Sequence, residues 1–261
     1  MNAGTDIVPA LEKAWENSLN ELFHQRIETI VQKIQLQSTY NELSNWKHSG
    51  GNDLLKGAFL VAKYQYPDIT FSEIEEKIEN IRKDAWIEMN DNLTALENVK
   101  ILNHVIYNIH RFSRNSSNFF SPQNSYINSV LETKKGNPLT LSIIYAVIGQ
   151  KLKLPVYGVN LPKNFILAYK DTHAALWDFE GDTYAGVLFY INPYNKGAVF
   201  GKKEIDHFIE QQKLEPRKEF YTPCSNVDII QRLINNLIES YNKLGYADKI
   251  KELTELLNAL E

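Results

Sequence analysis

The sequence predicts an α+β fold in which helices come first and last and a small antiparallel sheet lies between them. Apolar residues recur at three- and four-residue steps through most of the first 150 residues and again after Ser225, as they do in amphipathic helices. After Pro155 the spacing shortens to about two residues, and turns rich in Gly, Pro and Asp separate short strands. Consecutive short strands favour an antiparallel sheet over alternating parallel units.

The N-terminal segment, residues 1–95, is predicted to be helical, with breaks at residues 49–52 and at Pro67. A helix is expected from Leu54 to Tyr64, between the two breaks. Another is expected to begin near Ser72, whose side chain is a suitable N-cap ahead of several glutamates in the first turn.

The middle segment, residues 96–215, is predicted to contain a central helix and the sheet. Helices from Leu96 to Phe112 and from Tyr126 to Glu132 come first. The central helix begins at Pro138, because proline suits the first helical position and Asn137 can cap it. It is apolar almost all round, which is typical of a helix buried on every side. Four strands are predicted. The first begins at Val156, and the others span Asn164–Tyr169, Ala174–Phe179 and Val187–Ile191.

The C-terminal segment, residues 216–261, is predicted to form a helical hairpin that starts near Asn226 or Asp228 and turns at Gly245. One helix pair cannot bury both of its faces alone. We therefore expect it to dock on the sheet-bearing core and to leave a more polar face for a partner. The expected apolar stripes are Leu233, Leu237, Tyr241 and Leu244 in the first helix, and Ile250, Leu253, Leu256 and Leu257 in the second.

The composition is that of an ordinary soluble globular protein. Of 261 residues, 43% are hydrophobic and 23% are charged, and the net charge is −4. No segment concentrates Lys or Arg, so neither nucleic acid nor a membrane is an expected partner. The N-terminus has no secretory pattern, and no apolar run approaches the roughly 18 residues of a membrane helix. With a single cysteine and no metal-ligand motif, a cytoplasmic protein without cofactor or metal is expected.

Three stretches carry a resemblance to a known family. Asn124-Ser125, Val130-Leu131 and two lysines lead into Gly-Asn-Pro-Leu-Thr-Leu-Ser at residues 136–142, and Tyr-Ile-Asn-Pro-Tyr-Asn-Lys-Gly follows at 190–197. They resemble the transglutaminase-like superfamily, and most closely its bacterial SirB-one type, which also resembles a segment of an F-box protein. Residues 237–257 resemble one tetratricopeptide unit. The resemblance implies a papain/transglutaminase-like core, in which a central helix packs against the sheet.

Active members of this superfamily imply a Cys-His-Asp triad, with the cysteine at the start of the central helix and its partners on successive strands. The helix N-terminus lowers the thiol pKa, the histidine takes the proton, and the carboxylate fixes the imidazole tautomer. By the resemblance, these positions fall on Pro138, Asn164 and Asn192. None of them supplies a nucleophile, a useful base or a charge. The groove around these triad positions is expected to keep its shape. Pro138, Asn164 and Asn192 are therefore expected to lie close together.

The function implied is therefore that of a catalytically inactive protein that acts as a scaffold or regulatory binding module. Its unknown protein partner would bind at the C-terminal helices or in the groove. One alternative is a cysteine-independent hydrolase or acyl-transferase that uses Thr140 or Ser142 as its nucleophile. An alcohol needs a base for this, and His173 is the only histidine within the predicted sheet.

A second alternative is binding of a peptide or small molecule without chemistry. The hydrogen-bonding groups would then be the asparagines at the triad positions and the segment from Asn124 to Tyr126, with Thr140 and Ser142 close by at the start of the central helix.

Other reactive or aromatic residues are expected to be structural. Cys224 precedes a helix, but no histidine lies near it in sequence, which favours an unpartnered linker cysteine. His104 and His110 are six residues apart, so they lie on different faces of one helix and do not predict a metal site. Phe119 and Phe120 could line a ligand groove, although packing is the commoner role of such residues.

Overall fold

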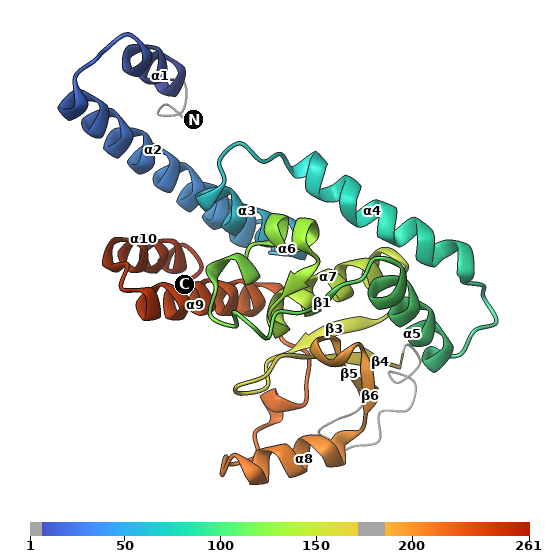
Figure 1. Cartoon of the computed structure of the whole chain (residues 1–261). Coiled ribbons are helices and arrows are strands. Elements are labelled where there is room, and N and C mark those ends of the chain that lie inside the picture. The colour runs from blue at the N-terminus through green and yellow to red at the C-terminus, as the bar shows by residue number, and fades with distance from the viewer. Residues whose placement is uncertain (1–6, 172–185) are drawn as a thin grey trace.

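The computed structural model describes residues 7–171 and 186–261 (Figure 1). These residues confirm the predicted fold class, with helical regions at both ends and a small antiparallel sheet. His173 and the predicted strand Ala174–Phe179 lie outside the described residues. The α-helices are α1 (Val8–Glu16), α2 (Glu21–His48), α3 (Leu54–Gln65), α4 (Phe71–Glu88), α5 (Ala95–Asn103), α6 (Ile127–Thr133), α7 (Pro138–Lys151), α8 (Lys202–Gln211), α9 (Asn226–Leu244) and α10 (Ala247–Asn258). The strands are β1 (Ser113–Arg114), β2 (Lys135–Gly136), β3 (Val156–Val159), β4 (Ile166–Lys170), β5 (Val187–Asn192) and β6 (Ala198–Phe200).

The first two helices form an arm that extends from the body of the molecule (Figure 1). Helix α1 has no buried residue, and it packs against α2. The second half of α2 joins the core through Leu43 and Trp46. The indole N–H of Trp46 donates a hydrogen bond to the carbonyl oxygen of Asp53 at 2.9 Å. That bond fixes the turn between α2 and α3.

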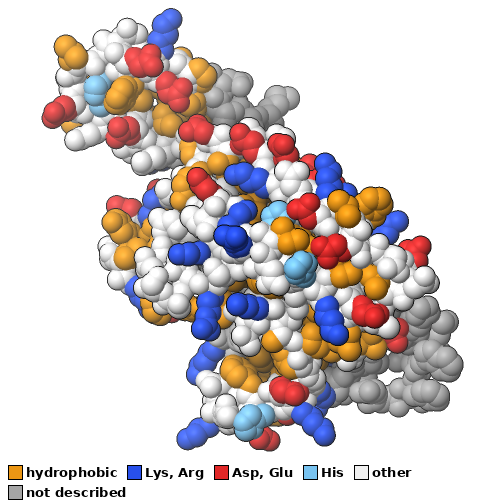
Figure 2. Space-filling model, turned by 45° about the vertical axis from the view of Figure 1, so that its right-hand side comes forward, with side chains coloured by type: hydrophobic (Ala, Val, Ile, Leu, Met, Phe, Trp, Pro, Cys, Tyr) orange, Lys and Arg blue, Asp and Glu red, His pale blue; other side chains and the backbone are white. Residues whose placement is uncertain are grey.

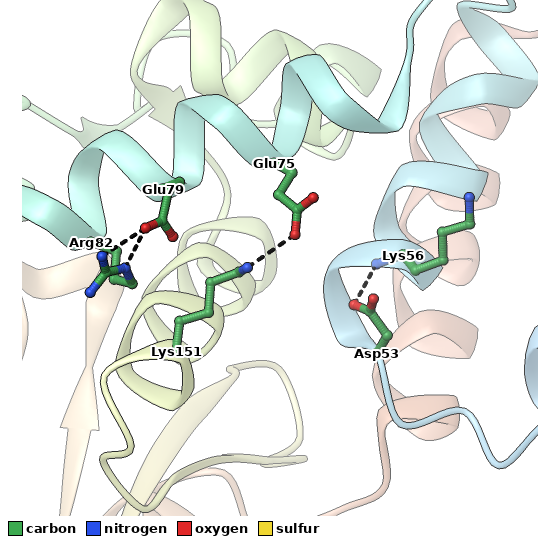
Figure 3. A network of polar contacts seen from close by, with 6 residues as sticks. All are labelled: Asp53, Lys56, Glu75, Glu79, Arg82 and Lys151. Atoms are coloured by element: carbon green, nitrogen blue, oxygen red, sulfur yellow. Dashed lines mark hydrogen bonds and ion pairs between the residues drawn. The ribbon is translucent and has the colours of Figure 1, made fainter.

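The N-cap of helix α4 lies two residues before the predicted one. Thr70, not Ser72, caps it: the Thr70 hydroxyl accepts from the Glu73 N–H, and the Glu73 carboxylate accepts from the Thr70 N–H. This reciprocal pair satisfies two backbone donors, which a lone serine cap would not. Buried isoleucines hold α4 against the central helix, and Lys151 of α7 pairs with Glu75 at 3.2 Å (Figure 3). That partly exposed ion pair contributes at most about 1 kcal/mol.

The helix predicted from Leu96 to Phe112 is regular only as far as Asn103. The following turn, η2 (His104–Ile109), is a π-helix, and the chain leaves it through hydrogen bonds from His110 N to Val105 O and from Phe112 N to Ile106 O. Such widened turns often accompany functional or packing constraints. Here the wide turn precedes β1, which pairs in parallel with β2 just ahead of α7.

The central helix forms as the sequence predicts. Asn137 caps α7 by accepting a hydrogen bond from Thr140 N at 2.9 Å, and every residue from Leu139 to Gly149 is buried. The antiparallel sheet, in the order β3-β4-β5-β6, lies on one side of α7. Strand β6, which the sequence analysis missed, returns along β5 after a turn at Gly197, where φ is +71°. A second, smaller hydrophobic cluster lies between the sheet and α8.

The C-terminal hairpin docks more widely than predicted. Helix α9 packs on α3 and α7, and α10 packs on α2, so the N-terminal helices supply much of the surface expected from the sheet-bearing core. The prediction that Leu244 belongs to the buried apolar stripe is wrong. Leu244 is 53% exposed, because α9 ends beyond the body at that point. One hydrophobic cluster takes residues from all three predicted segments, from Leu43 to Leu260. The division of the chain at residues 95 and 215 stays a prediction.

Candidate functional site

A cavity of about 520 Å³ opens at the start of the central helix. It lies where the N-terminus of α7, the loop between β3 and β4, the face of α9 and the loop before η3 (Pro122–Asn124) come together. This volume is within the usual range for small-ligand sites. The lining residues are Phe119, Phe120, Asn137, Pro138, Leu139, Lys163, Asn164, Phe165, Arg232, Asn236, Glu239 and Ser240.

Two of the three positions that the resemblance assigns to a triad line this cavity. Pro138 comes from the first turn of α7, and Asn164 from the loop just before β4. Asn192 is not among the lining residues. It ends β5, and its side chain accepts a hydrogen bond from Asn195 N at 3.2 Å, which shapes the turn into β6. That turn still reaches the cavity wall, because the Tyr194 ring meets the Phe119 ring edge-on at 6.4 Å.

The hydroxyls near the start of α7 are occupied inside the protein. Thr140 and Ser142 are both fully buried, and neither lines the cavity. The Thr140 hydroxyl donates to Asn137 Oδ1 at 3.2 Å, and the Ser142 hydroxyl donates to Pro138 O at 2.7 Å. Within residues 7–171 and 186–261, no histidine or carboxylate forms a hydrogen bond with either hydroxyl. An alcohol nucleophile needs such a base.

Asn124 and Tyr126 lie behind the cavity wall rather than in it. The Asn124 amide donates to the carbonyl oxygens of Asn118 and Phe119, at 2.7 and 3.1 Å, and accepts from the Asn115 amide at 2.8 Å. The Tyr126 hydroxyl pairs with the Tyr241 hydroxyl of α9 at 3.1 Å. Both residues are buried and engaged, so they support the loop and the helix that line the cavity.

Arg232 is the main polar group that the sequence analysis missed. Its guanidinium donates to the Asn160 side chain, to Leu161 O at 3.0 Å and to Asn164 O at 2.9 Å. Burial lowers the pKa of Arg232 from its ordinary value. The signal that could have found it is its position: it lies between the buried Ile230 and Leu233 of α9, where a charged residue is unusual.

Cys224 is not an activated nucleophile. Its thiol is half-buried and lies 3.3 Å from Gly158 O, to which it donates a hydrogen bond. Burial raises the pKa of the Cys224 thiol to about 12, so the thiol is neutral at physiological pH. It lines a different cavity, beside Asn160 and Asp228.

His104 in η2 and His110 just after it are also separate from the site. His104 is exposed and contacts Asn108, whereas His110 pairs with Asp84 at 2.8 Å. In the part of the chain that the structure describes, no group of three or more His, Cys, Asp or Glu side chains could hold a metal ion. No described helix is both long and apolar enough to cross a bilayer.

Positively charged side chains gather on one face of the molecule. Figure 2 shows several Lys and Arg side chains gathered over the middle of one face of the body. A net charge of −4 therefore hides a locally cationic face.

Comparisons with known proteins agree with the geometry of the core. A family model described as "Transglutaminase-like superfamily" matches residues 72–235. The chain is 25% identical over 207 residues to a UPF0162 protein of Xylella fastidiosa, across 75% of this chain and 67% of that protein. It is 34% identical over 91 residues to a UPF0162 protein of Pasteurella multocida, across 35% of this chain and 34% of that protein.

A further relative is the mouse F-box only protein 21, which is 26% identical over 157 residues. The match covers 60% of this chain and 23% of the mouse protein, so the shared region is a small part of that protein. No solved structure matches this chain.

Proposed function

Because the chain belongs to the transglutaminase-like superfamily, we propose that it is a catalytically inactive member that acts as a scaffold or regulatory binding module. The observation that carries this proposal is the chemistry of the three triad positions. Proline stands where the nucleophile is expected, and asparagines stand where the base and the carboxylate are expected. An amide neither takes up a proton at neutral pH nor carries charge.

The local structure supports the same conclusion. The Asn164 side chain accepts a hydrogen bond from the Phe165 N–H at 2.9 Å, and the Asn192 side chain caps a turn. Both amides therefore serve the backbone around them. The chain's single cysteine has a raised pKa and lies in another cavity. These observations support a groove that keeps its shape without the groups that acyl transfer requires.

A cysteine-independent enzyme is the rival proposal, and the surroundings of Thr140 and Ser142 weigh against it. Both hydroxyls are buried and donate to oxygens of the helix start, and neither faces the cavity. A substrate carbonyl in the cavity would have to approach through the wall of α7. Binding without chemistry needs no such rearrangement.

The C-terminal hairpin is the second part of the proposal. We infer that α9 and α10 act like a tetratricopeptide unit, with one face packed on the body and the other open to a protein partner. The turn between the helices supports this proposal, because Leu244 and Tyr246 are 53% and 57% exposed there. Apolar side chains on an exposed turn are common at protein contacts. We also propose that the protein is cytoplasmic.

An activity assay tests the catalytic part of the proposal. The purified full-length chain is incubated with peptide, ester and glutamine-amide substrates, beside the variants Cys224→Ser, Thr140→Val and Ser142→Ala. We expect all four proteins to leave the substrates at the uncatalysed rate. Turnover by the unmodified protein that is lost in Cys224→Ser would overturn the proposal. Loss in either hydroxyl variant alone would instead establish the cysteine-independent enzyme.

A further inference from the structure

The cavity carries positive charge that the described protein does not neutralise. Two cations line it, Arg232 from α9 and Lys163 from the loop before β4. The Lys163 ammonium donates to the neutral Gln212 side chain at 2.9 Å. The one lining carboxylate, Glu239, pairs with Lys243 at 3.4 Å. A cavity with this balance favours an anionic group in its occupant.

Arg232 has donors left over for such a group. A guanidinium has five N–H groups in a fixed fork. Two on Nη1 are used by Asn160 and Leu161, and one on Nη2 is used by Asn164. The Nε–H and the second Nη2–H have no acceptor among the described residues. The three acceptors that Arg232 does use are all neutral, so its positive charge has no charged partner among the described residues. Arginine is well suited to binding a carboxylate through two parallel hydrogen bonds.

Part of the cavity lining is aromatic, and buried hydrogen bonds fix the loop that carries it. Phe119 and Phe120 are each 45% exposed, and their rings meet edge-on at 5.1 Å. Exposed phenylalanines in a polar loop would ordinarily move, yet the buried Asn124 amide fixes this loop with three hydrogen bonds. Preorganised aromatic side chains at a cavity are suited to an apolar ligand group, because little entropy is lost on binding.

Amide groups complete the lining. The Asn236 side chain forms no hydrogen bond with any described residue, and the Asn164 side chain uses only its oxygen. An amide can donate to a peptide carbonyl and accept from a peptide N–H. These amides line the same cavity as Arg232 and the two phenylalanines, a combination that suits a short extended peptide.

We propose that this cavity binds a peptide that presents a carboxylate to Arg232 and a neighbouring aromatic side chain to Phe119, beside the Phe120 ring, over which the Lys243 ammonium lies at 3.0 Å from the centroid. The inference rests on the proposed function, binding without chemistry, and specifies the ligand class of that same site. The carboxylate belongs to an acidic side chain or to a chain terminus, since both present the same planar group.

Changes in the ligand test the proposal on the unmodified protein. The probes are acetyl-Phe-Glu-amide, its matched control acetyl-Phe-Gln-amide, and acetyl-Gln-Phe with a free terminal carboxylate, each titrated by NMR against isotope-labelled full-length chain. We expect at least one carboxylate probe to bind about tenfold or more tightly than the glutamine amide, as a charge-assisted hydrogen bond predicts. The probe that binds shows whether the carboxylate comes from an acidic side chain or from a chain terminus. Equal affinities for all three probes, or no binding of any, would overturn the inference.

Changes in the protein locate the site. Phe119→Ala removes an exposed ring and should weaken the carboxylate probe severalfold, whereas Trp86→Ala, which removes a 63% exposed ring on α4, should not. Arg232→Lys keeps the charge and loses the fork, so it should narrow the difference between the Glu and Gln probes. If Arg232→Lys does not fold, the comparison of probes on the unmodified chain still decides. Affinity unchanged by Phe119→Ala would place binding elsewhere.

These experiments test the peptide site and the absence of catalytic activity separately. Probes that neither bind nor react would refute the peptide site and leave the inactive assignment intact. A probe that binds and is consumed would refute the inactive assignment and leave the site intact.

Discussion

Replacing Leu237 by alanine should destabilise the protein far more than the same change at Leu244. The two leucines are seven residues apart on α9, so they belong to one predicted stripe. Leu237 is fully buried in the main core, whereas Leu244 is 53% exposed beyond it. A buried Leu→Ala change costs about 2–5 kcal/mol through lost burial and the cavity left behind. An exposed one is usually within about 0.5 kcal/mol.

Thermal unfolding followed by circular dichroism measures the difference. For a chain of this size, 1 kcal/mol corresponds to roughly 2–4 °C in Tm. We therefore expect Leu237→Ala to lower Tm by at least about 4 °C and Leu244→Ala by at most about 2 °C. Equal shifts in the two variants would refute the docking of α9 on α3 and α7. The hairpin would then be an independent arm.

Three further predictions test other parts of the structure. Asn137→Ala removes the cap of α7 and leaves the Thr140 N–H without its acceptor, so the free energy of unfolding should fall by about 1–2 kcal/mol in a urea titration, and an unchanged midpoint would contradict the cap. The Cys224 thiol, with its pKa raised to about 12, should react with iodoacetamide much more slowly in native than in urea-unfolded protein at pH 8. Since the native state holds this proton more tightly, the same shift should lower stability as pH rises from about 9 towards 12, and equal native and unfolded alkylation rates would contradict both statements. Gly197→Ala should lower Tm more than Gly245→Ala: both glycines have positive φ, but only at Gly197 would a Cβ meet Asn103 Oδ1, at 1.8 Å, and equal shifts would argue against that close approach.

The sequence predicted the elements whose signals are local. Pro138 and Asn137 mark the start of α7 through proline geometry and a side-chain cap, and both roles are confirmed. The turn at Gly245, where φ is +79°, follows from the freedom of glycine to adopt a left-handed conformation. The change from helical to strand spacing after Pro155 also depends only on neighbouring residues.

Features that depend on contacts between distant segments could not be predicted in this way. Ser72 has the residue type of a cap and precedes a helix, whereas the reciprocal bonds between Thr70 and Glu73 determine the actual start. The exposure of Leu244 depends on where the body ends, which periodicity does not encode. The short strand β6 pairs with β5 after a turn at Gly197, whose carbonyl oxygen accepts a hydrogen bond from the distant Asn103 side chain.

In the candidate site, too, local motifs could be predicted and contacts between distant segments could not. The resemblance assigned Pro138 and Asn164, which line one cavity, on the strength of a motif at each position. Arg232 has no motif: its importance comes from the acceptors on a loop about 70 residues earlier and from its unused donors. For Phe119 and Phe120 the sequence favours packing, and ligand contact at this cavity stays a proposal.

Binding without turnover is tested most directly by one NMR experiment on the full-length chain. Acetyl-Phe-Glu-amide is added in excess, and the signals of the protein and the intensity of the probe are followed in the same sample for a day. We predict saturable shifts at residues that line the cavity, with the probe unchanged in amount and chemical form. Steady conversion of the probe into a hydrolysed or transferred product, above a protein-free control, would contradict the inactive assignment.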